Sequence, residues 1–357
     1  MHESRGLGDV YKRQVENHRH CPYRVMRVED RDETATLEFQ APEFGLDVLG
    51  TIVENDLVQW ALWQSLTVMA GVDFPGPGRV SELGYEQGLP VVTLESGEAI
   101  RARLLAAADG AASQLRQLLG IGQRHWEYGQ AGIVGVVRSA EPNRGVAWQR
   151  FIEGGPIAFL PLPDGRSSMV WSCPESEAGR RLELDDDAFL AELEQAVSGS
   201  PGHWPGPLEA IGPRASFPLT MRLSDRYAGR RAVLLGDAAH VMHPLAGQGV
   251  NTGLLDAAGL VEKLIEARAE QRDIGDARVL ERYERWRRSE AEMMSQGVHG
   301  LRGLFLPEEL GLLRRAGLGL VARSWTVRDV FIKRATGRHS NAPALARGQS
   351  LADLLHS

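Results

Sequence analysis

The sequence has few cysteines, few aromatic residues and no long hydrophobic run. Two cysteines among 357 residues, Cys21 and Cys173, are too few for a disulfide framework, so a reducing cytosol is the expected environment. No apolar stretch approaches the roughly 18 residues of a membrane-spanning helix, and the polar residues 1–14 lack the apolar core of a signal peptide. A hydrophobic content of 43% and a charged content of 24% indicate a folded globular protein and exclude a disordered chain.

The net charge of −7 argues against nucleic acid as the main partner. From Leu310 onward, eight Arg and Lys residues face only Asp329 and Asp353, so this tail carries +6 and the rest of the chain −13. Such a tail predicts contact with an anionic membrane surface or an acidic partner, and the alternative is a solvated helical face. His240 and His243 lie three residues apart without a third ligand nearby, so we expect no metal site.

The order of the expected elements indicates a mixed α/β fold with an inserted antiparallel sheet. Alternating residues at 34–39 predict a strand, residues 71–88 a loop, and residues 91–107 a hairpin that leads into a buried strand. Four short β-like runs between residues 132 and 171 are separated by Pro, Gly and Asn turns, which is typical of an antiparallel sheet. A buried strand is expected at 231–235, and the C-terminal part reads as helical. Helices are expected at 56–68 (with Asn55 or Asp56 as N-cap), 185–197, 252–271 and 276–299.

The strongest motif is a short apolar strand that ends in Gly236-Asp237. An Asp at a strand end can accept hydrogen bonds from the hydroxyls of a ribose or ribityl chain, and the glycine lets the backbone approach the ligand. The following segment 243–251 contains Gly247 and Gly249, and with the next helix N-terminus it predicts a pocket for partial negative charge. The alternative is a strand–turn–helix in which the glycines serve only the turn.

A second motif, residues 104–116, is a buried strand that ends in Asp109-Gly110 and is followed by small residues. Their size allows a ligand to approach the backbone closely. Asp109 can bind a hydroxyl group or cap the next helix, and Ser113 can do either. Both interpretations stay open for this segment.

Together these motifs resemble the FAD-dependent aromatic-ring hydroxylases of the para-hydroxybenzoate hydroxylase type. The similarity is closest to the branch that hydroxylates the ring in ubiquinone biosynthesis, and it runs from about Pro22 to about Gly337. The combination of the Gly-Asp-Ala-Ala-His stretch (236–240) with the segment 243–251 that follows it is specific to this family. Further similar stretches are residues 49–55, 126–130, 147–151, 158–162 and 282–285.

The resemblance implies FAD as the cofactor and a role for each matching residue. Asp237, next to Gly236, would bind the ribityl chain, and Asp109 with Gly110 would touch FAD and the route of NAD(P)H. The Gly249 and Val250 amides would face the N1/O2 edge of the flavin. The remaining implied cofactor residues are Asn251 near the same edge, Pro244 near the ring face, Gly247 in the loop, and Asn55, where relatives often carry Arg or Gln. His243 is the candidate for a base that deprotonates the substrate.

The resemblance further implies a monooxygenase that uses NAD(P)H and O2 to hydroxylate the ring of a polyprenylated phenol or quinol. Such an enzyme would be cytoplasmic, with peripheral contact with the inner face of the membrane or with a biosynthetic complex. The tail residues expected to make that contact are Arg314, Arg315, Arg323 and Arg328. The alternatives are a non-catalytic subunit of a quinone-biosynthesis complex, or another flavoprotein oxidoreductase of the same fold. A halogenase would be expected to use a lysine, and the chain has only Lys12, Lys263 and Lys333.

The chain departs from the family at its start. Relatives open with a strand, a Gly-x-Gly-x-x-Gly turn and a helix that hold the FAD pyrophosphate, and residues 5–9 lack the strand and helix around their two glycines. We therefore expect a fragment that lacks the adenine and pyrophosphate half of a discontinuous Rossmann-like domain. The expected divisions are an unmatched or artefactual leader (1–21), part of the FAD-binding domain with an excursion into the substrate sheet (22–125), an antiparallel-sheet substrate domain (126–220), the flavin-ring half of the FAD-binding domain (221–300) and a helical C-terminal segment (301–357).

Overall fold

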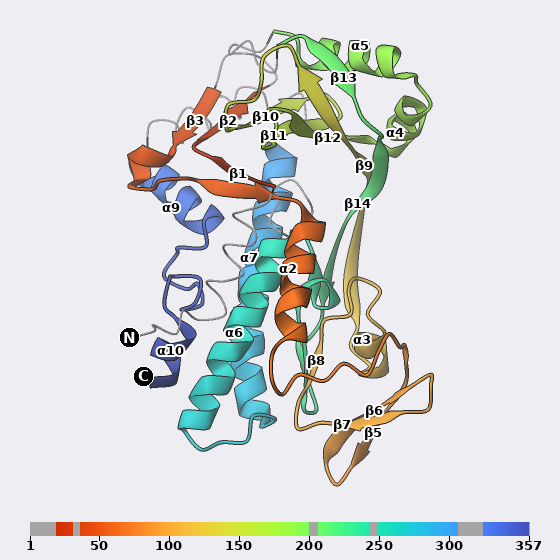
Figure 1. Ribbon diagram of the computed structural model, residues 1–357, viewed down its shortest axis with the longest axis vertical. Coiled ribbons are helices and arrows are strands. Elements are labelled where there is room, and N and C mark those ends of the chain that lie inside the picture. Colours follow the sequence, from red (N-terminus) through yellow and green to blue (C-terminus); the bar gives the residue numbers. More distant parts are fainter. Residues whose placement is uncertain (1–18, 31–35, 200–205, 243–248, 306–323, 357) are drawn as a thin grey trace. The chain divides into compact units, whose positions relative to one another are not determined.

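The computed structural model describes residues 19–30, 36–199, 206–242, 249–305 and 324–356 (Figure 1). The contacts divide the chain into two compact units, which we describe separately. Unit 1 consists of Met1–Phe74, Gly129–Pro218 and Leu304–Ile332, and unit 2 of Pro75–Tyr128, Leu219–Gly303 and Lys333–Ser357. Residues up to Phe74 thus group with the middle sheet, so the block 22–125 expected from the sequence is shared by both units.

The antiparallel sheet predicted for the middle of the chain forms the main sheet of unit 1. Its strand order is β9-β12-β11-β10-β2-β3, and β13 also pairs with β9. All of these pairings are antiparallel except β10 with β2, which is parallel. The strands are β2 (Val25–Glu29), β3 (Thr36–Gln40), β9 (Gln123–Ser139), β10 (Val146–Ile152), β11 (Gly155–Pro161), β12 (Ser167–Pro174) and β13 (Leu208–Ile211).

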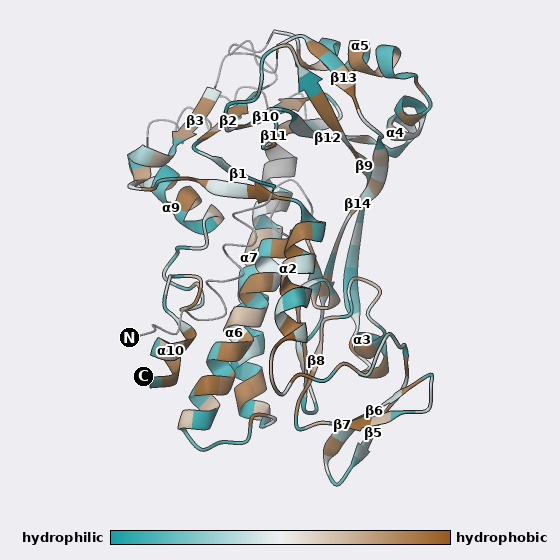
Figure 2. Cartoon of the chain, in the orientation of Figure 1, coloured by the Kyte–Doolittle hydropathy of each residue, from teal (hydrophilic) through white to brown (hydrophobic). Residues whose placement is uncertain are grey.

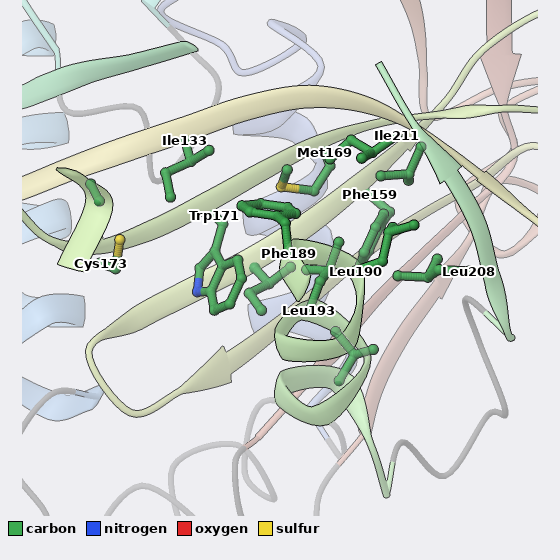
Figure 3. Close-up of a cluster of buried hydrophobic side chains, with 14 of the residues drawn as sticks. Ile133, Phe159, Met169, Trp171, Cys173, Phe189, Leu190, Leu193, Leu208 and Ile211 are labelled. Carbon is green, nitrogen blue, oxygen red and sulfur yellow. The ribbon is translucent and has the colours of Figure 1, made fainter. Parts of the chain in front are cut away.

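Helix α5 (Asp186–Val197) covers one face of this sheet and completes its core. As the sequence predicts, the helix begins after Asp185, whose side chain accepts a hydrogen bond from the Ala188 amide at 2.8 Å. Figure 3 shows Phe189 of α5 against the ring of Trp171, with 5.8 Å between their ring centroids. Alternate residues of the strands point into this core. Its largest fully buried members are Trp148, Phe159, Phe189, Ile133, Ile157, Met169 and Leu193.

The sequence leaves two interpretations open for the aromatic residues in its strand-rich middle: core packing, or the wall of a pocket for a flat aromatic substrate. Trp148, Phe159 and Trp171 are buried at 2% exposure or less, so the core interpretation is confirmed for these three. Trp126 is partly buried in unit 2, where it packs against a different core.

The rest of unit 1 consists of short elements beside the sheet. They are β1 (His20–Tyr23), paired with β4 (Gly50–Val53), the 3₁₀ helix η1 (Ala41–Phe44), α2 (Asn55–Thr67) and α4 (Glu175–Leu182). Helix α2 is where the sequence predicts it, but Glu54 is its N-cap and no side chain caps it. The expectation that Asn55 or Asp56 would cap this helix is wrong, because the helix already includes both.

Helix α9 (Trp325–Ala335) begins in unit 1, where Trp325 stacks on Phe44 at 5.1 Å between ring centroids. Arg328 donates hydrogen bonds to the Glu38 carbonyl and to the Glu43 carboxylate, both at 2.6 Å. Its guanidinium thus binds this unit, and the expected contact of Arg328 with a membrane surface or a partner stays a prediction. The other three arginines expected to do so, Arg314, Arg315 and Arg323, lie outside the described residues. None of the helices in the described part of the chain is long and apolar enough to span a membrane.

Unit 2 contains two small sheets and two long helices. Strands β5 (Val80–Glu86), β6 (Leu89–Leu94) and β7 (Ala99–Arg101) form an antiparallel sheet, which confirms the hairpin around Ser96-Gly97. The loop expected at 71–88 is wrong over β5. The second sheet has the order β15-β16-β8, with β8 (Leu105–Ala107), β15 (Ala228–Gly229) and β16 (Ala232–Leu234).

The long helices of unit 2 are α6 (Gly249–Ala269) and α7 (Ala277–Phe305), which share a core with the second sheet. The short helix α3 (Gln114–Leu118) contacts β5, and α10 (Leu351–His356) contacts α6. Strands β14 (Ala215–Ser224) and β17 (His240–Val241) continue the sheet of β9, in the order β17-β14-β9. Figure 2 shows hydrophobic and hydrophilic bands alternating along α6, as expected for a helix with one buried face. Leu260 of α6 and Leu280 of α7 are buried together with Val233 and Leu234 of β16.

Candidate functional site

The two motifs singled out in the sequence end at the same edge of the β15-β16-β8 sheet. Strands β8 and β16 run parallel, with Ala107 opposite Leu234, and the Leu235 amide donates to the Ala107 carbonyl at 2.9 Å. Asp109-Gly110 follows one strand and Gly236-Asp237 the other. In open α/β sheets, ligands bind beyond the carboxyl ends of parallel strands. The structure therefore brings together two segments separated by more than a hundred residues, at the edge where a cofactor is expected.

The turn after β16 presents Asp237 to solvent. Gly236 has φ = +53°, a left-handed conformation that favours glycine, and it opens the 3₁₀ helix η2 (Gly236–Ala238). The Asp237 side chain is exposed, and no described residue donates a hydrogen bond to its carboxylate. An exposed carboxylate without a protein donor is available for the hydroxyl groups of a ligand.

The loop after β8 is shaped by Asp109 itself. One carboxylate oxygen accepts a hydrogen bond from the Ser113 hydroxyl at 2.5 Å, and the other accepts one from the Leu115 amide at 3.0 Å. Ser113 in turn caps α3 by accepting from the Arg116 amide. Gly110 has φ = +83°, and a Cβ added to it would meet no atom within 4 Å. Asp109 thus acts as a cap, and its direct contact with a cofactor stays a prediction, as does that of Gly110.

Arg116 joins the two loops, a role that the sequence did not reveal. Its guanidinium donates to the Ala238 carbonyl at 3.0 Å and to the Ala111 carbonyl at 3.1 Å. The side chain is buried at 6% exposure, and this burial lowers the pKa of Arg116 below its usual value. A buried cation with two carbonyl acceptors, one on each loop, holds the loops in a fixed relation.

Helix α7 supports the strand that carries the turn. The buried Tyr283 hydroxyl donates to the Leu234 carbonyl at 2.9 Å, and burial raises the pKa of Tyr283 well above its ordinary value. The neighbouring Glu284 carboxylate accepts from the Tyr227 and Ala228 amides at 3.0 and 2.7 Å. The stretch 282–285, one of those similar to the family, therefore has a structural role next to β16.

The start of α6 supplies the third part of the site. Gly249 is its first residue, and Val250 and Leu254 are 61% and 51% exposed. The first amides of an α-helix lack partners within the helix and carry partial positive charge, which suits an electron-rich group. Asn251 lies in the same first turn. The roles predicted for Gly249, Val250 and Asn251 stay predictions.

Three other predicted residues, His243, Pro244 and Gly247, lie outside the described residues. Asn55 is the exposed first residue of α2 in unit 1, and its cofactor role stays a prediction.

Sequence reasoning also missed Asp256 of α6, which is fully buried. Its carboxylate accepts hydrogen bonds from the Gly236 amide at 3.1 Å and from Arg287 Nε at 2.8 Å, and it lies 2.6 Å from His240 Nε2. His240, considered above as a metal ligand, therefore belongs to a buried hydrogen-bond network. The only signal in the sequence was an acidic residue within an otherwise apolar part of the helix.

The comparisons with known proteins agree with this site. A family model described as FAD binding domain matches residues 5–298. The chain belongs to the FAD binding domain family.

Two relatives within this family are named for quinone hydroxylation. The ubiquinone hydroxylase UbiL of Rhodospirillum rubrum is 37% identical over 308 residues, which cover 85% of this chain and 71% of that protein. The 3-demethoxyubiquinol 3-hydroxylase of Escherichia coli is 36% identical over 321 residues, which cover 88% and 80%. The resemblance to the flavin hydroxylases of ubiquinone biosynthesis is thus confirmed, with FAD as the cofactor and monooxygenation as the type of reaction.

Solved structures share the fold at lower sequence identity. The p-nitrophenol 4-monooxygenase PnpA from Pseudomonas putida has a TM-score of 0.70 at 18% identity, with 91% of this chain and 84% of that chain covered. Klebsiella pneumoniae HpxO, complexed with FAD and uric acid, has a TM-score of 0.68 at 21% identity, with 94% and 85% covered. The mixed α/β fold predicted from the sequence is confirmed.

The described residues fit the flavin end of FAD. Asp237 offers a carboxylate to ribityl hydroxyls, and Gly110 leaves open space beside the neighbouring loop. The α6 N-terminus offers amides to the electron-rich edge of the ring. The exposed Val250 and Leu254 provide apolar surface for a flat ring.

Proposed function

We propose that this flavin monooxygenase hydroxylates the aromatic ring of a polyprenylated phenol or quinol in ubiquinone biosynthesis, with NAD(P)H and O2 as co-substrates. The observation that carries the proposal is the meeting of the Asp109 loop and the Asp237 turn at one sheet edge, in a chain of this family. The names of the two relatives above supply the substrate class.

FAD, when bound, supplies the redox chemistry and the activation of oxygen, which no side chain of the protein can provide. The protein contributes position. In the proposed function, Asp237 accepts hydrogen bonds from the ribityl hydroxyls, and Arg116 keeps the two loops together around them. The α6 N-terminus stabilises negative charge at the edge of the ring. This reaction needs no protein nucleophile.

The main sheet of unit 1 has a face that suits a hydrophobic substrate. Val134, Val170, Ala158 and Gln149 lie opposite one another across β9, β12, β11 and β10, on the face turned away from the core under α5. All four are only partly buried. Ligand pockets are mostly apolar with a few polar groups. We propose this row of three apolar side chains and one amide as the binding surface for the ring or its prenyl chain.

The partners follow from the substrate class. A polyprenylated ring resides in the bilayer or in a carrier complex, so we propose peripheral contact of the protein with the membrane or with such a complex. His243 is retained as the proposed base for deprotonating the phenol, since a histidine titrates in the useful pH range.

The proposal is tested by supplying the purified chain with FAD, NADH or NADPH, and a short-chain prenylated phenol under ¹⁸O₂. We expect a product that contains one labelled oxygen, formed in proportion to NAD(P)H consumed. Asp237→Ala should reduce product at limiting FAD and regain part of it at high FAD. NAD(P)H oxidation that yields only hydrogen peroxide with every prenylated phenol and quinol tried would refute the proposed substrate class. No flavin binding at any concentration would leave two interpretations, a non-catalytic subunit or a fragment without the pyrophosphate half of the FAD site.

A further inference from the structure

The buried side chain of Asp256 links the proposed FAD-binding turn to helix α6. Asp256 is 0% exposed and accepts a hydrogen bond from the Gly236 amide at 3.1 Å, directly before Asp237. The same carboxylate oxygen lies 2.6 Å from His240 Nε2, just beyond the turn. A nitrogen that faces a carboxylate oxygen at this distance carries the hydrogen, so His240 donates. Two groups that flank Asp237 are thus bound by one side chain.

Gly253, one helical turn before Asp256, brings α6 unusually close to the same turn. A Cβ at Gly253 would lie 3.2 Å from the Gly236 Cα, and a Cβ at Gly236 would lie 3.6 Å from the Gly253 Cα. Residues three apart on a helix share one face. Gly253 and Asp256 therefore form a platform on α6 that contacts Gly236 through backbone and carboxylate together.

Arg287 of α7 compensates the charge of this platform. Its Nε donates to the other Asp256 oxygen at 2.8 Å, and its side chain is 1% exposed. Gly259 leaves room for it, because a Cβ there would lie 3.0 Å from the Arg287 Cδ. A buried carboxylate without such a partner would be strongly unfavourable. Arg287 accounts for the charge of Asp256, but not for the two contacts with the turn.

We propose that Asp256 and Gly253 are positioning residues that hold the Gly236-Asp237 turn in the geometry in which it binds FAD. This inference rests on the proposed function, because it takes Asp237 to be the ligand of the ribityl chain. Asp256 acts through the Gly236 amide and His240, and Gly253 acts by the close approach of the helix. Neither residue contacts the cofactor in this assignment.

The first test uses Gly253→Ala, with Gly297→Ala as the matched control. Both exchange a helical glycine for alanine, but a Cβ at Gly297 in α7 would meet nothing within 4 Å. Gly253→Ala should weaken FAD binding about tenfold or more because the turn must move. Gly297→Ala should leave FAD binding unchanged. The dissociation constant is measured in the complete chain by quenching of flavin fluorescence.

The second test uses Asp256→Asn combined with Arg287→Gln. Asp256→Asn alone would leave a buried guanidinium without its counter-charge and would endanger folding, whereas the pair leaves two neutral amides of similar size. FAD binding should weaken roughly ten- to a hundredfold. Amide hydrogen exchange in the peptide 235–240 should become faster without FAD present. Unchanged exchange there would refute the inference by a readout that needs no cofactor.

A double-mutant cycle with Asp237→Ala separates positioning from general stability. If Asp256 and Gly253 act through the turn, Gly253→Ala should cost much less FAD affinity in the Asp237→Ala background than in the native chain. Equal costs in both backgrounds would refute the inference and leave the proposed function intact. An Asp237→Ala variant that binds FAD as tightly as the native chain would refute the proposed cofactor site itself.

Discussion

Replacement of Arg116 by methionine tests whether the two loops are held together as the structure indicates. Methionine keeps much of the buried length of the side chain and removes both hydrogen bonds. The Ala238 carbonyl keeps a second donor, the Ser224 hydroxyl at 3.3 Å, whereas no other described donor reaches the Ala111 carbonyl. A hydrogen bond from a charged donor contributes about 1.5–3 kcal/mol. One bond is lost in full and one is partly replaced.

We therefore expect Arg116→Met to lower the free energy of unfolding by about 2 kcal/mol, and the Tm by roughly 3 °C. FAD affinity should fall as well, because the loops that carry Asp109 and Asp237 are no longer tied together. Arg116→Lys should lie between methionine and the native residue, since a single ammonium cannot span two carbonyls as the guanidinium does. Urea unfolding, thermal unfolding and flavin titration measure these changes.

The matched control is Arg124→Met, in the same unit. Arg124 pairs with Glu292 at 3.0 Å, but its side chain is 47% exposed. An exposed ion pair contributes roughly 0–1 kcal/mol, so this variant should be nearly as stable as the native chain and bind FAD equally well. If Arg116→Met and Arg124→Met unfold at the same urea concentration and bind FAD alike, Arg116 does not hold the loops and the reasoning fails.

Three further predictions concern single side chains. Asp237→Ala should weaken FAD binding about ten- to a hundredfold, as measured by flavin titration, and unchanged affinity would assign Asp237 to the turn alone. Arg231 holds the pKa of Asp273 well below its usual range. This partly exposed pair should therefore stabilise the folded protein by under about 1 kcal/mol. The stabilisation is present above the unfolded-state pKa of about 3.9 and is lost as the pH falls further. Asp273→Asn should therefore reduce the acid sensitivity of urea unfolding. Arg328→Ala should destabilise the protein by about 2 kcal/mol, whereas exposed Arg338→Ala should not, and equal urea midpoints would contradict this. Neither arginine variant alone should abolish binding to anionic vesicles.

Features that depend on local patterns could be predicted from the sequence. The strand that ends in Gly236-Asp237 is one, because a short apolar run followed by glycine and a polar residue determines both the burial of the strand and the exposure of Asp237. The run of strands β9 to β12 is another, since strands and Pro or Gly turns alternate there without long connections. The cap at Asp185 also follows from a local pattern.

Local patterns were misleading where the chain context decides. In β5, Gly84 and three polar residues break the alternation, and the Pro-Gly-rich segment before it indicates a loop. The strand forms because β6 pairs along its length. At α2, Asn55 and Asp56 are good capping residues, but the helix begins at Asn55 with Glu54 as its N-cap, and residues that favour caps also occur in the first turn.

The parts of the site that no pattern showed are those made by contacts between distant segments. The parallel pairing of β8 with β16 joins residues more than 120 positions apart. No residue pattern in either strand indicates that the two strands pair. The same holds for Arg116, whose two acceptors lie on separate loops. An arginine or aspartate within a helix usually faces water, so a sequence pattern assigns both residues to the surface.

Asp256 shows what this means for the function of the site. Its charge is compatible with burial only because Arg287, on another helix, neutralises it, and its remaining hydrogen bonds go to the turn that carries Asp237. Asp237, the residue proposed to bind FAD, can thus be recognised from the strand that precedes it, whereas its geometry depends on α6 and α7. A substitution on α6 or α7 that leaves every cofactor contact unchanged should therefore still alter flavin binding. The Gly253→Ala variant should do so by moving the backbone of Gly236, without removing a hydrogen-bonding group.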